Sequence, residues 1–265
     1  MQRLLGIEWA KIAPYRAFRV LVIIYLIGFI LMPWSLEMVP FFRNLQQLFE
    51  FPNIWAFYYW GATWGTLLPV IIIMTFTCTE YTNRTFRQHI IDGMSRSEVF
   101  QAKMLLMFGL ALGVSLIFTV NGLIAGYSNT FMLEQGDVFR KAWYIPAYFL
   151  QILGIMAMAF FIANLIRRTG LAIFAFLAWI MFEGLARPLL KHVAKDKGIV
   201  SDHLPLGTLW KHDINLEQIF QDPALAFDTA RLIPPGPSLE TMIWKVIWIG
   251  VFLGGSYLLI KKRDL

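Results

Sequence analysis

The residues of this sequence that could do chemistry are few, and the most suggestive pair is Glu183 and Arg187. A carboxylate and a guanidinium four residues apart share one face of a helix, where they could act as an acid–base pair or form an ion pair. Because both lie at the end of an apolar segment, we expect an ion pair at the membrane boundary. The sequence contains no G-x-x-x-x-G-K-[ST], H-E-x-x-H or G-x-S-x-G motif, so any ATP hydrolysis must come from another polypeptide.

Metal and thiol chemistry have even less support in the sequence. His192, His203 and His212 are widely and irregularly spaced, which matches no metal-ligand pattern. Cys78 is the only cysteine, so neither an intrachain disulfide nor a multi-cysteine metal site can form. We therefore expect no metal and no cofactor in this chain.

The elements that must position these residues are long apolar segments. Of the 265 residues, 58% are hydrophobic and 15% are charged, and the mean hydropathy is +0.59, which exceeds what a water-soluble domain can bury. Most of the segments reach the roughly 20 residues that a membrane-spanning helix needs, and the alternating segments of a membrane β-barrel are absent. We predict an all-α, polytopic membrane protein with six transmembrane helices, at residues 18–34, 54–78, 104–127, 143–166, 170–185 and 239–260.

Lysine and arginine are unevenly divided between the two sides of this predicted bundle. The positive-inside rule places the richer side, with both termini, in the cytoplasm. Residues 1–17 are predicted to form an interfacial helix there, and residues 186–238 form a long external connection. The net charge of +6 is then a topology signal rather than a nucleic-acid surface. The richer side holds Arg3, Lys11, Arg16, Arg19, Arg84, Arg87, Arg96, Lys103, Arg167, Arg168, Lys261, Lys262 and Arg263, and the poorer side holds Arg43, Arg140 and Lys141.

Small and polar residues inside the spans indicate how the helices pack. Pro69 should kink the second span, because it removes one backbone hydrogen bond. The amides of Asn121, Gln151 and Asn164 should form hydrogen bonds between helices. Glycine pairs with the spacing that allows close helix packing are Gly61 with Gly65, Gly109 with Gly113, Gly122 with Gly126, and Gly250 with Gly254.

The polar segment 79–103 interrupts the apolar pattern and is predicted to contain two helices. In residues 84–91, Phe86 and Ile90 share one helical face, while the arginines point elsewhere. Asp92 and Gly93 then break the helix. Ser95 and Glu98 have the spacing of a capping box, which begins a new helix that continues into the third span. A simple loop would need none of these features, so the segment indicates either a partner-docking helix or one that packs on lipid headgroups.

The sequence TEYTNRTFRQHIIDGMSRSEVFQAKML resembles the first cytoplasmic loop of ABC type-2 permeases, the membrane subunits of ATP-driven bacterial exporters. The leader RLLGIEWAKIAPYRAF, the closing KKRDL and the six-span layout are similar to that family as well, so the resemblance covers essentially the whole chain as one permease domain. The residues that match the loop pattern are Glu80, Tyr81, Thr85, Phe86, Arg87, Asp92, Gly93, Ser95, Arg96, Glu98 and Lys103.

The resemblance implies that residues 79–103 contain a coupling helix, which transmits movement from two cytosolic ATPase subunits to the membrane helices. Phe86 would supply an apolar knob facing the ATPase, and Arg84 and Arg87 would pair with its carboxylates. ATP and Mg²⁺ would be bound by the ATPase. The resemblance also implies a dimer, with an identical or a paralogous permease, in the bacterial inner membrane.

Two other functional classes stay open on the sequence alone. An E-x-x-x-R pair resembles one motif of intramembrane proteases, but the membrane-embedded histidines of that pattern are missing. An ion-coupled carrier would place ionisable groups near the middle of the membrane, where this chain has only amides. The substrate of an exporter is not indicated by the sequence.

Overall fold

The computed structural model describes residues 6, 9, 13–39, 45–91, 93–131, 136–193, 200–211, 233 and 236–262, and every regular element among them is helical. The all-α prediction is therefore confirmed for the described part of the chain. The elements are α2 (Arg16–Met38), η1 (Gln46–Leu48), α4 (Ile54–Gly65), α5 (Leu67–Thr82), α6 (Thr85–Ile91), α7 (Arg96–Asn129), α8 (Asp137–Arg140), α9 (Tyr144–Ile166), α10 (Thr169–His192), α11 (Pro205–Leu209) and α14 (Leu239–Lys262).

Five helical segments in the described residues are long and apolar enough to cross a membrane. They are Ile54–Thr82, Arg96–Asn129, Asp137–Ile166, Thr169–His192 and Leu239–Lys262, which correspond to the second to sixth predicted spans. The first predicted span lies in α2, where the apolar helical stretch Phe18–Met32 is shorter. The chain is thus a membrane protein by its helices, and the first of the six predicted spans stays a prediction.

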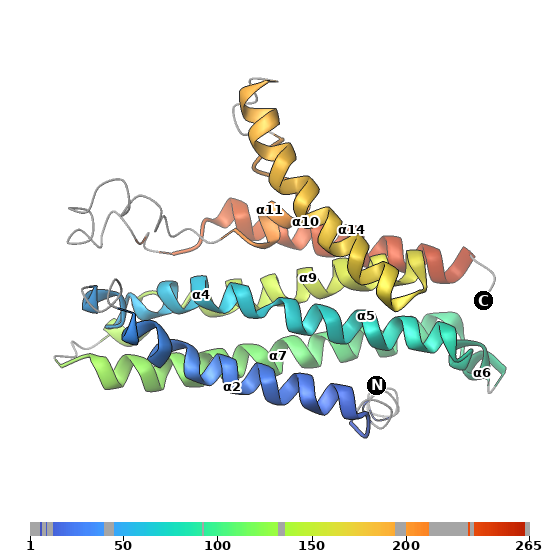
Figure 1. Ribbon diagram of the computed structural model, residues 1–265, viewed down its shortest axis with the longest axis horizontal. Coiled ribbons are helices and arrows are strands. Elements are labelled where there is room, and N and C mark those ends of the chain that lie inside the picture. Colours follow the sequence, from blue (N-terminus) through green and yellow to red (C-terminus); the bar gives the residue numbers. More distant parts are fainter. Residues whose placement is uncertain are drawn as a thin grey trace.

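The helix α9 forms the centre of the bundle. It packs against α14, α5, α7 and α4, and 67% of its most apolar window is buried inside the protein. Figure 1 shows α4, α5, α7 and α9 running along the long axis, with the C-terminal half of α10 leaving the bundle. For α10 the buried share is only 17%. Because lipid is as apolar as these side chains, close packing rather than the hydrophobic effect holds the helices together.

The second span is interrupted three residues before Pro69, the residue at which the sequence predicted a kink. The span divides into α4 and α5 at Thr66. Pro69 has no N–H to donate to the carbonyl group of Gly65, and its ring crowds that carbonyl. The Thr66 hydroxyl donates to the Thr63 carbonyl at 2.7 Å and helps to satisfy the broken turn.

The glycine pairs have different surroundings within the described part of the chain. Gly61 is buried in α4, and added Cβ atoms at Gly65, Gly122 and Gly126 would crowd the aromatic rings of Tyr25, Trp55 and Phe51. These glycines therefore admit aromatic side chains rather than a second helix backbone. A Cβ atom at Gly109, Gly113, Gly250 or Gly254 would meet nothing within 4 Å, so these four glycines make no close packing contact with the residues that the structure describes.

Candidate functional site

The α6 helix and the turns on either side of it form the segment that the sequence marked most strongly. It begins after Arg84, which has a positive φ of 57°, and ends before Gly93, whose φ is 96°. The N–H groups of Gly93 and Met94 donate to the carbonyl oxygens of Ile90 and His89 at 3.1 and 2.9 Å. This is the Schellman pattern of a helix end, and its left-handed position is the reason for a glycine there. Asp92 lies outside the described residues.

The start of α7 confirms the predicted capping box. The Ser95 hydroxyl accepts from the Glu98 N–H at 3.2 Å, and the Glu98 carboxylate accepts from the Ser95 N–H at 2.7 Å. Two backbone donors that would otherwise lack partners at the helix start are thereby satisfied. The path of the chain between α6 and α7 is fixed at both ends, by the glycine turn and by this cap.

A buried ion pair connects the two long helices on either side of α6. Lys103 Nζ in α7 lies 2.6 Å from Glu80 Oε1 in α5, and the two side chains are only 5% and 10% exposed. At this depth a lysine or glutamate is tolerated when it is paired and hydrogen-bonded. The sequence pattern contained both residues but did not predict that they would meet.

Phe86 does not form the exposed knob that was expected, and this is a correction. Its side chain is 3% exposed and stacks on Tyr81, with ring centroids 5.2 Å apart and an interplanar angle of 8°. The Tyr81 hydroxyl in turn donates to Asn164 Oδ1 in α9 at 2.7 Å. The guanidinium group of Arg167 lies 4.8 Å from the centre of the Tyr81 ring. Phe86 points inward because its aromatic partner lies on α5.

The beginning of α7 is also joined to the end of α14. The Arg96 side chain donates to the backbone carbonyls of Ile260 and Lys261 at 3.4 and 2.9 Å. Carbonyl groups at a helix end lack intrahelical partners, so a cation that donates to them is favourable. The short α6 helix therefore belongs to a unit that includes the ends of α5, α7, α9 and α14, which we call the α6 end of the bundle.

The exposed residues of α6 and of the turn after it are mostly polar, apart from Ile91, among those that the structure describes. Arg84, Gln88, Ser95 and Glu98 are exposed, and Ile91 is 83% exposed. Thr85 and Ile90 are half-buried, and the Arg87 side chain lies outside the description. Ile91 is thus the exposed apolar residue of α6, a role that the sequence analysis had predicted for Phe86.

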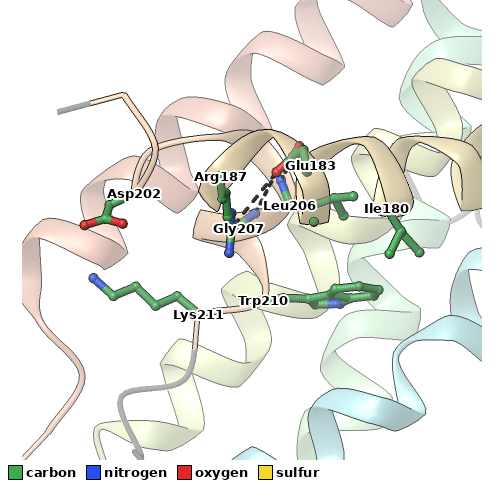
Figure 2. Close-up of a pocket in the computed structure, with 9 residues that line it drawn as sticks. Ile180, Glu183, Arg187, Asp202, Leu206, Gly207, Trp210 and Lys211 are labelled. Carbon is green, nitrogen blue, oxygen red and sulfur yellow. Dashed lines mark hydrogen bonds and ion pairs between the residues drawn. The ribbon is translucent and has the colours of Figure 1, made fainter. Parts of the chain in front are cut away.

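A second cluster of ionisable residues surrounds a cavity of about 410 Å³ between α10 and α11. The predicted ion pair is present, with Arg187 Nη2 3.8 Å from Glu183 Oε2. Glu183 also accepts from the Leu206 and Gly207 N–H groups, both at 3.0 Å. Figure 2 shows Asp202, Arg187 and Lys211 around the opening, with Trp210 beside them.

Sequence reasoning missed most of this cavity, because its walls come from separate segments. Trp210 reaches across to α5 and donates its indole N–H to Thr66 Oγ1 at 3.0 Å.

Lys245 in α14 is 1% exposed, and its ammonium group donates to the Tyr59 hydroxyl at 2.6 Å. A single lysine in an apolar run was the only signal in the sequence for this buried contact.

The membrane-embedded amides form the interhelical bonds that were expected. Asn121 in α7 donates to the Phe29 carbonyl in α2 at 2.8 Å and to the Tyr58 hydroxyl. Gln151 in α9 donates to Thr63 Oγ1 in α4 at 3.0 Å. Together with Asn164 they hold α9 and α7 against the neighbouring helices.

In the part of the chain that the structure describes, no three His, Cys, Asp or Glu residues form a group that could hold a metal ion. His203 instead stacks on Trp244 with ring centroids 4.6 Å apart, and His212 lies outside the described residues. Comparison with protein-family models gives no match for this chain, and comparison with curated proteins gives none either.

Proposed function

We propose that this chain is the permease subunit of an ATP-driven exporter in the bacterial inner membrane, and that α6 is the helix on which a separate ATPase docks. The observation that carries the proposal is the connection of one short, surface-exposed helix to the ends of four long helices. Phe86 connects α6 to α5 by stacking on Tyr81. The ends of the long helices are joined to each other by the contacts of Glu80 with Lys103, Tyr81 with Asn164, and Arg96 with the end of α14.

This arrangement suits the transmission of force. A loop held only by its two chain ends would bend when a partner pushed on it, and the membrane helices would stay where they were. The stacked Phe86 and Tyr81 rings fill the space behind α6, so a push on α6 is carried to α5 and α9. Coupling in general needs such a contiguous packed path between two sites.

The docking surface in this proposal is the exposed part of α6 and the turn after it. Arg84 and Arg87 would pair with carboxylates of the ATPase, and Ile91, which is 83% exposed, would enter an apolar pocket on it. An apolar anchor surrounded by charged groups is the usual arrangement of an energetically important contact. Gly93 would shape the turn, and Ser95 and Glu98 would fix the start of α7.

The cytoplasmic placement of α6 is supported by the charges near it. Arg84, Arg96, Lys261 and Lys262 all lie at the α6 end, and Figure 1 places the beginning of α2 and the end of α14 there as well. By the positive-inside rule this end faces the cytoplasm. ATP and Mg²⁺ would be bound by the ATPase subunits, so the chain itself would need no cofactor and would catalyse no reaction alone.

A complete exporter would contain two permease subunits and two ATPases. The second permease would be a copy of this chain or a paralogue. The helix surfaces around Gly109 with Gly113, and around Gly250 with Gly254, have open space at the glycine Cα atoms. Small residues with that spacing allow close approach of a helix from a second subunit.

The docking test is the double substitution Arg84→Glu with Ile91→Ser in the full chain, co-expressed with its candidate ATPase. We expect normal membrane insertion, loss of ATPase copurification and loss of ATPase stimulation. A matched control is Arg140→Glu, which changes an exposed arginine that pairs with Asp137 at 3.7 Å in α8. Normal ATPase recruitment by the double variant would refute docking on α6. Phe86 is unsuitable for this test, because its burial makes any polar substitution a test of folding.

An ion-coupled carrier is the second candidate, and the buried Lys245 is the observation that favours it. Its side chain lies inside the bundle against Tyr59, and ionisable groups inside a membrane commonly mark an ion path. Transport that follows a proton gradient without ATP, and that Lys245→Met abolishes, would support the carrier over the exporter.

A further inference from the structure

The cavity between α10 and α11 is lined by positively charged side chains that are not fully paired with the carboxylates of its lining. Glu183 accepts from the Trp179 indole N–H at 2.6 Å as well as from the Leu206 and Gly207 N–H groups. Three N–H donors already compensate much of its charge, and Arg187 lies farther away, at 3.8 Å. Hydrogen bonds to charged acceptors of this kind are individually stronger than neutral ones.

The second carboxylate at the cavity, Asp202, also has a partner. Its Oδ1 atom lies 2.7 Å from the ammonium group of Lys191, the last lysine of α10. Asp202 is therefore neutralised from outside the cavity wall. The cavity consequently does not select a cation, although two acidic residues line it.

The donors that remain belong to Arg187 and Lys211. The Nε atom of Arg187 is buried without a hydrogen-bond partner among the described residues, and a buried donor in that state costs stability until something accepts from it. The backbone carbonyl of Lys211 accepts from the Tyr59 hydroxyl at 3.2 Å. That contact fixes the chain, while the Lys211 side chain extends along the opening of the cavity (Figure 2).

The surroundings of these donors are amphipathic. Ile180 and Trp210 provide an apolar wall, and the surface of α10 beside the cavity exposes Phe182 and Leu185, at 68% and 67%. Arg187 and Lys191 lie in the last two turns of α10, where charged side chains of a membrane span reach the headgroup region. A ligand here would have its charge at Arg187 and Lys211 and its apolar part along α10.

We infer that this cavity binds the anionic headgroup of a phospholipid, with Arg187 and Lys211 as the phosphate-binding residues and Trp210 beside the glycerol region. Arginine suits this task, because its planar fork of donors matches phosphate oxygens. The site lies away from α6 and does not depend on the proposed docking function. The same donors would also accept a free phosphate ion, so the experiment must separate the two sources.

The experiment counts lipids bound to the purified full-length protein in detergent by native mass spectrometry. Dioleoylphosphatidylglycerol, dioleoylphosphatidylcholine and inorganic phosphate are titrated separately. We expect one tightly held phosphatidylglycerol and weaker binding of the zwitterionic lipid. In Arg187→Gln and in Lys211→Gln we expect the dissociation constant for phosphatidylglycerol to rise about tenfold, the effect of one charge-assisted hydrogen bond.

Two further variants keep the test decisive. Arg140→Gln removes an exposed arginine elsewhere in the chain and should change the dissociation constant less than about twofold, as surface charges usually do. Gly207→Ala leaves all charges in place, but its Cβ atom would overlap the guanidinium group of Arg187, so it should weaken lipid binding as Arg187→Gln does. If Arg187→Gln fails to fold, Lys211→Gln carries the test alone.

Three outcomes would overturn the lipid assignment. The first is equal retention of the anionic and the zwitterionic lipid. The second is equal loss of binding in Arg140→Gln and in Lys211→Gln. The third is displacement of the lipid by millimolar inorganic phosphate, which would assign the cavity to a free anion. ATPase copurification should be unchanged in every variant, so failure of this site and failure of docking on α6 are distinguishable.

Discussion

Two carboxylate–cation pairs in this molecule have the same chemistry and different surroundings. Glu80 and Lys103 lie 2.6 Å apart at the α6 end, with side chains at most 10% exposed. Glu183 and Arg187 lie 3.8 Å apart beside the cavity, and the Arg187 side chain is 36% exposed. The first pair joins two long helices, whereas the second joins residues one turn apart on the same helix.

The difference shows that the neighbours of a charged pair, more than its residue types, determine what the pair can do. At the α6 end the surrounding helices α5, α7 and α9 pack closely, so the charges depend on each other. Beside the cavity, backbone N–H groups of α11 donate to Glu183 and compensate its negative charge in place of Arg187. Arg187 is therefore available to a ligand, and Lys103 is not.

The contrast between the two ion pairs is tested most directly by a substitution at Lys103. We expect Lys103→Met to lower the free energy of unfolding by about 4 kcal/mol, because it leaves the Glu80 carboxylate buried without its lysine. Denaturant titration in detergent micelles, followed by the loss of helical circular dichroism, measures the change. Arg187→Gln should lower it by about 0.5 kcal/mol, because the Arg187 side chain is 36% exposed and backbone N–H groups already compensate Glu183.

The double variant Glu80→Gln with Lys103→Met provides the control. It removes both charges, so the loss should be about 2 kcal/mol smaller than the sum of the two single losses, as coupled neighbours require. Strict additivity would show that the two residues do not depend on each other and would contradict the contrast between the two pairs.

A smaller loss is expected at the carboxylate of the cavity. Glu183→Gln keeps the size of the side chain, but it replaces a charged acceptor that faces three N–H donors by one neutral oxygen. We expect a loss of about 2 kcal/mol, since hydrogen bonds to charged groups contribute about 1.5–3 kcal/mol each and some of them persist. Thermal unfolding of the purified protein measures it. Asp202→Asn, at a 45% exposed side chain, is the matched control and should cost under about 1 kcal/mol.

The sequence predicts the α6 end well wherever the signals are local. The break at Gly93 and the cap at Ser95 depend on residues within five positions of each other, and both are confirmed. The predicted direction of the Phe86 side chain was wrong, because it depends on Tyr81 and, through it, on Asn164, which lies 83 residues from Tyr81 in the chain. Helical periodicity identifies which residues share a face but not which element covers that face.

The cavity could not be predicted, because it is made by three segments that the chain brings together. The spacing of Glu183 and Arg187 indicated their ion pair, and that pair is present. Nothing in the spacing shows that Gly207 would lie against Arg187 or that Trp210 would bond to Thr66. The glycine pairs are limited in a similar way, since GxxxG spacing predicts a possible packing surface and not its partner.

The smallest expected effect is at the cap of α7. Ser95→Ala removes the acceptor of the Glu98 N–H and one half of the capping box, so the free energy of unfolding should fall by about 1 kcal/mol. Ser97→Ala, two residues into the same helix, should change it by less than about 0.3 kcal/mol, because alanine is the better helix former there. The N-cap residue of α10, Arg168, forms no side-chain cap hydrogen bond, so Arg168→Ser should add stability there, since its backbone already has the extended conformation of a cap. If Ser95→Ala cost no more than Ser97→Ala, the start of α7 would owe its position to Arg96 and Lys103 alone, and the local signal that predicted it would be dispensable.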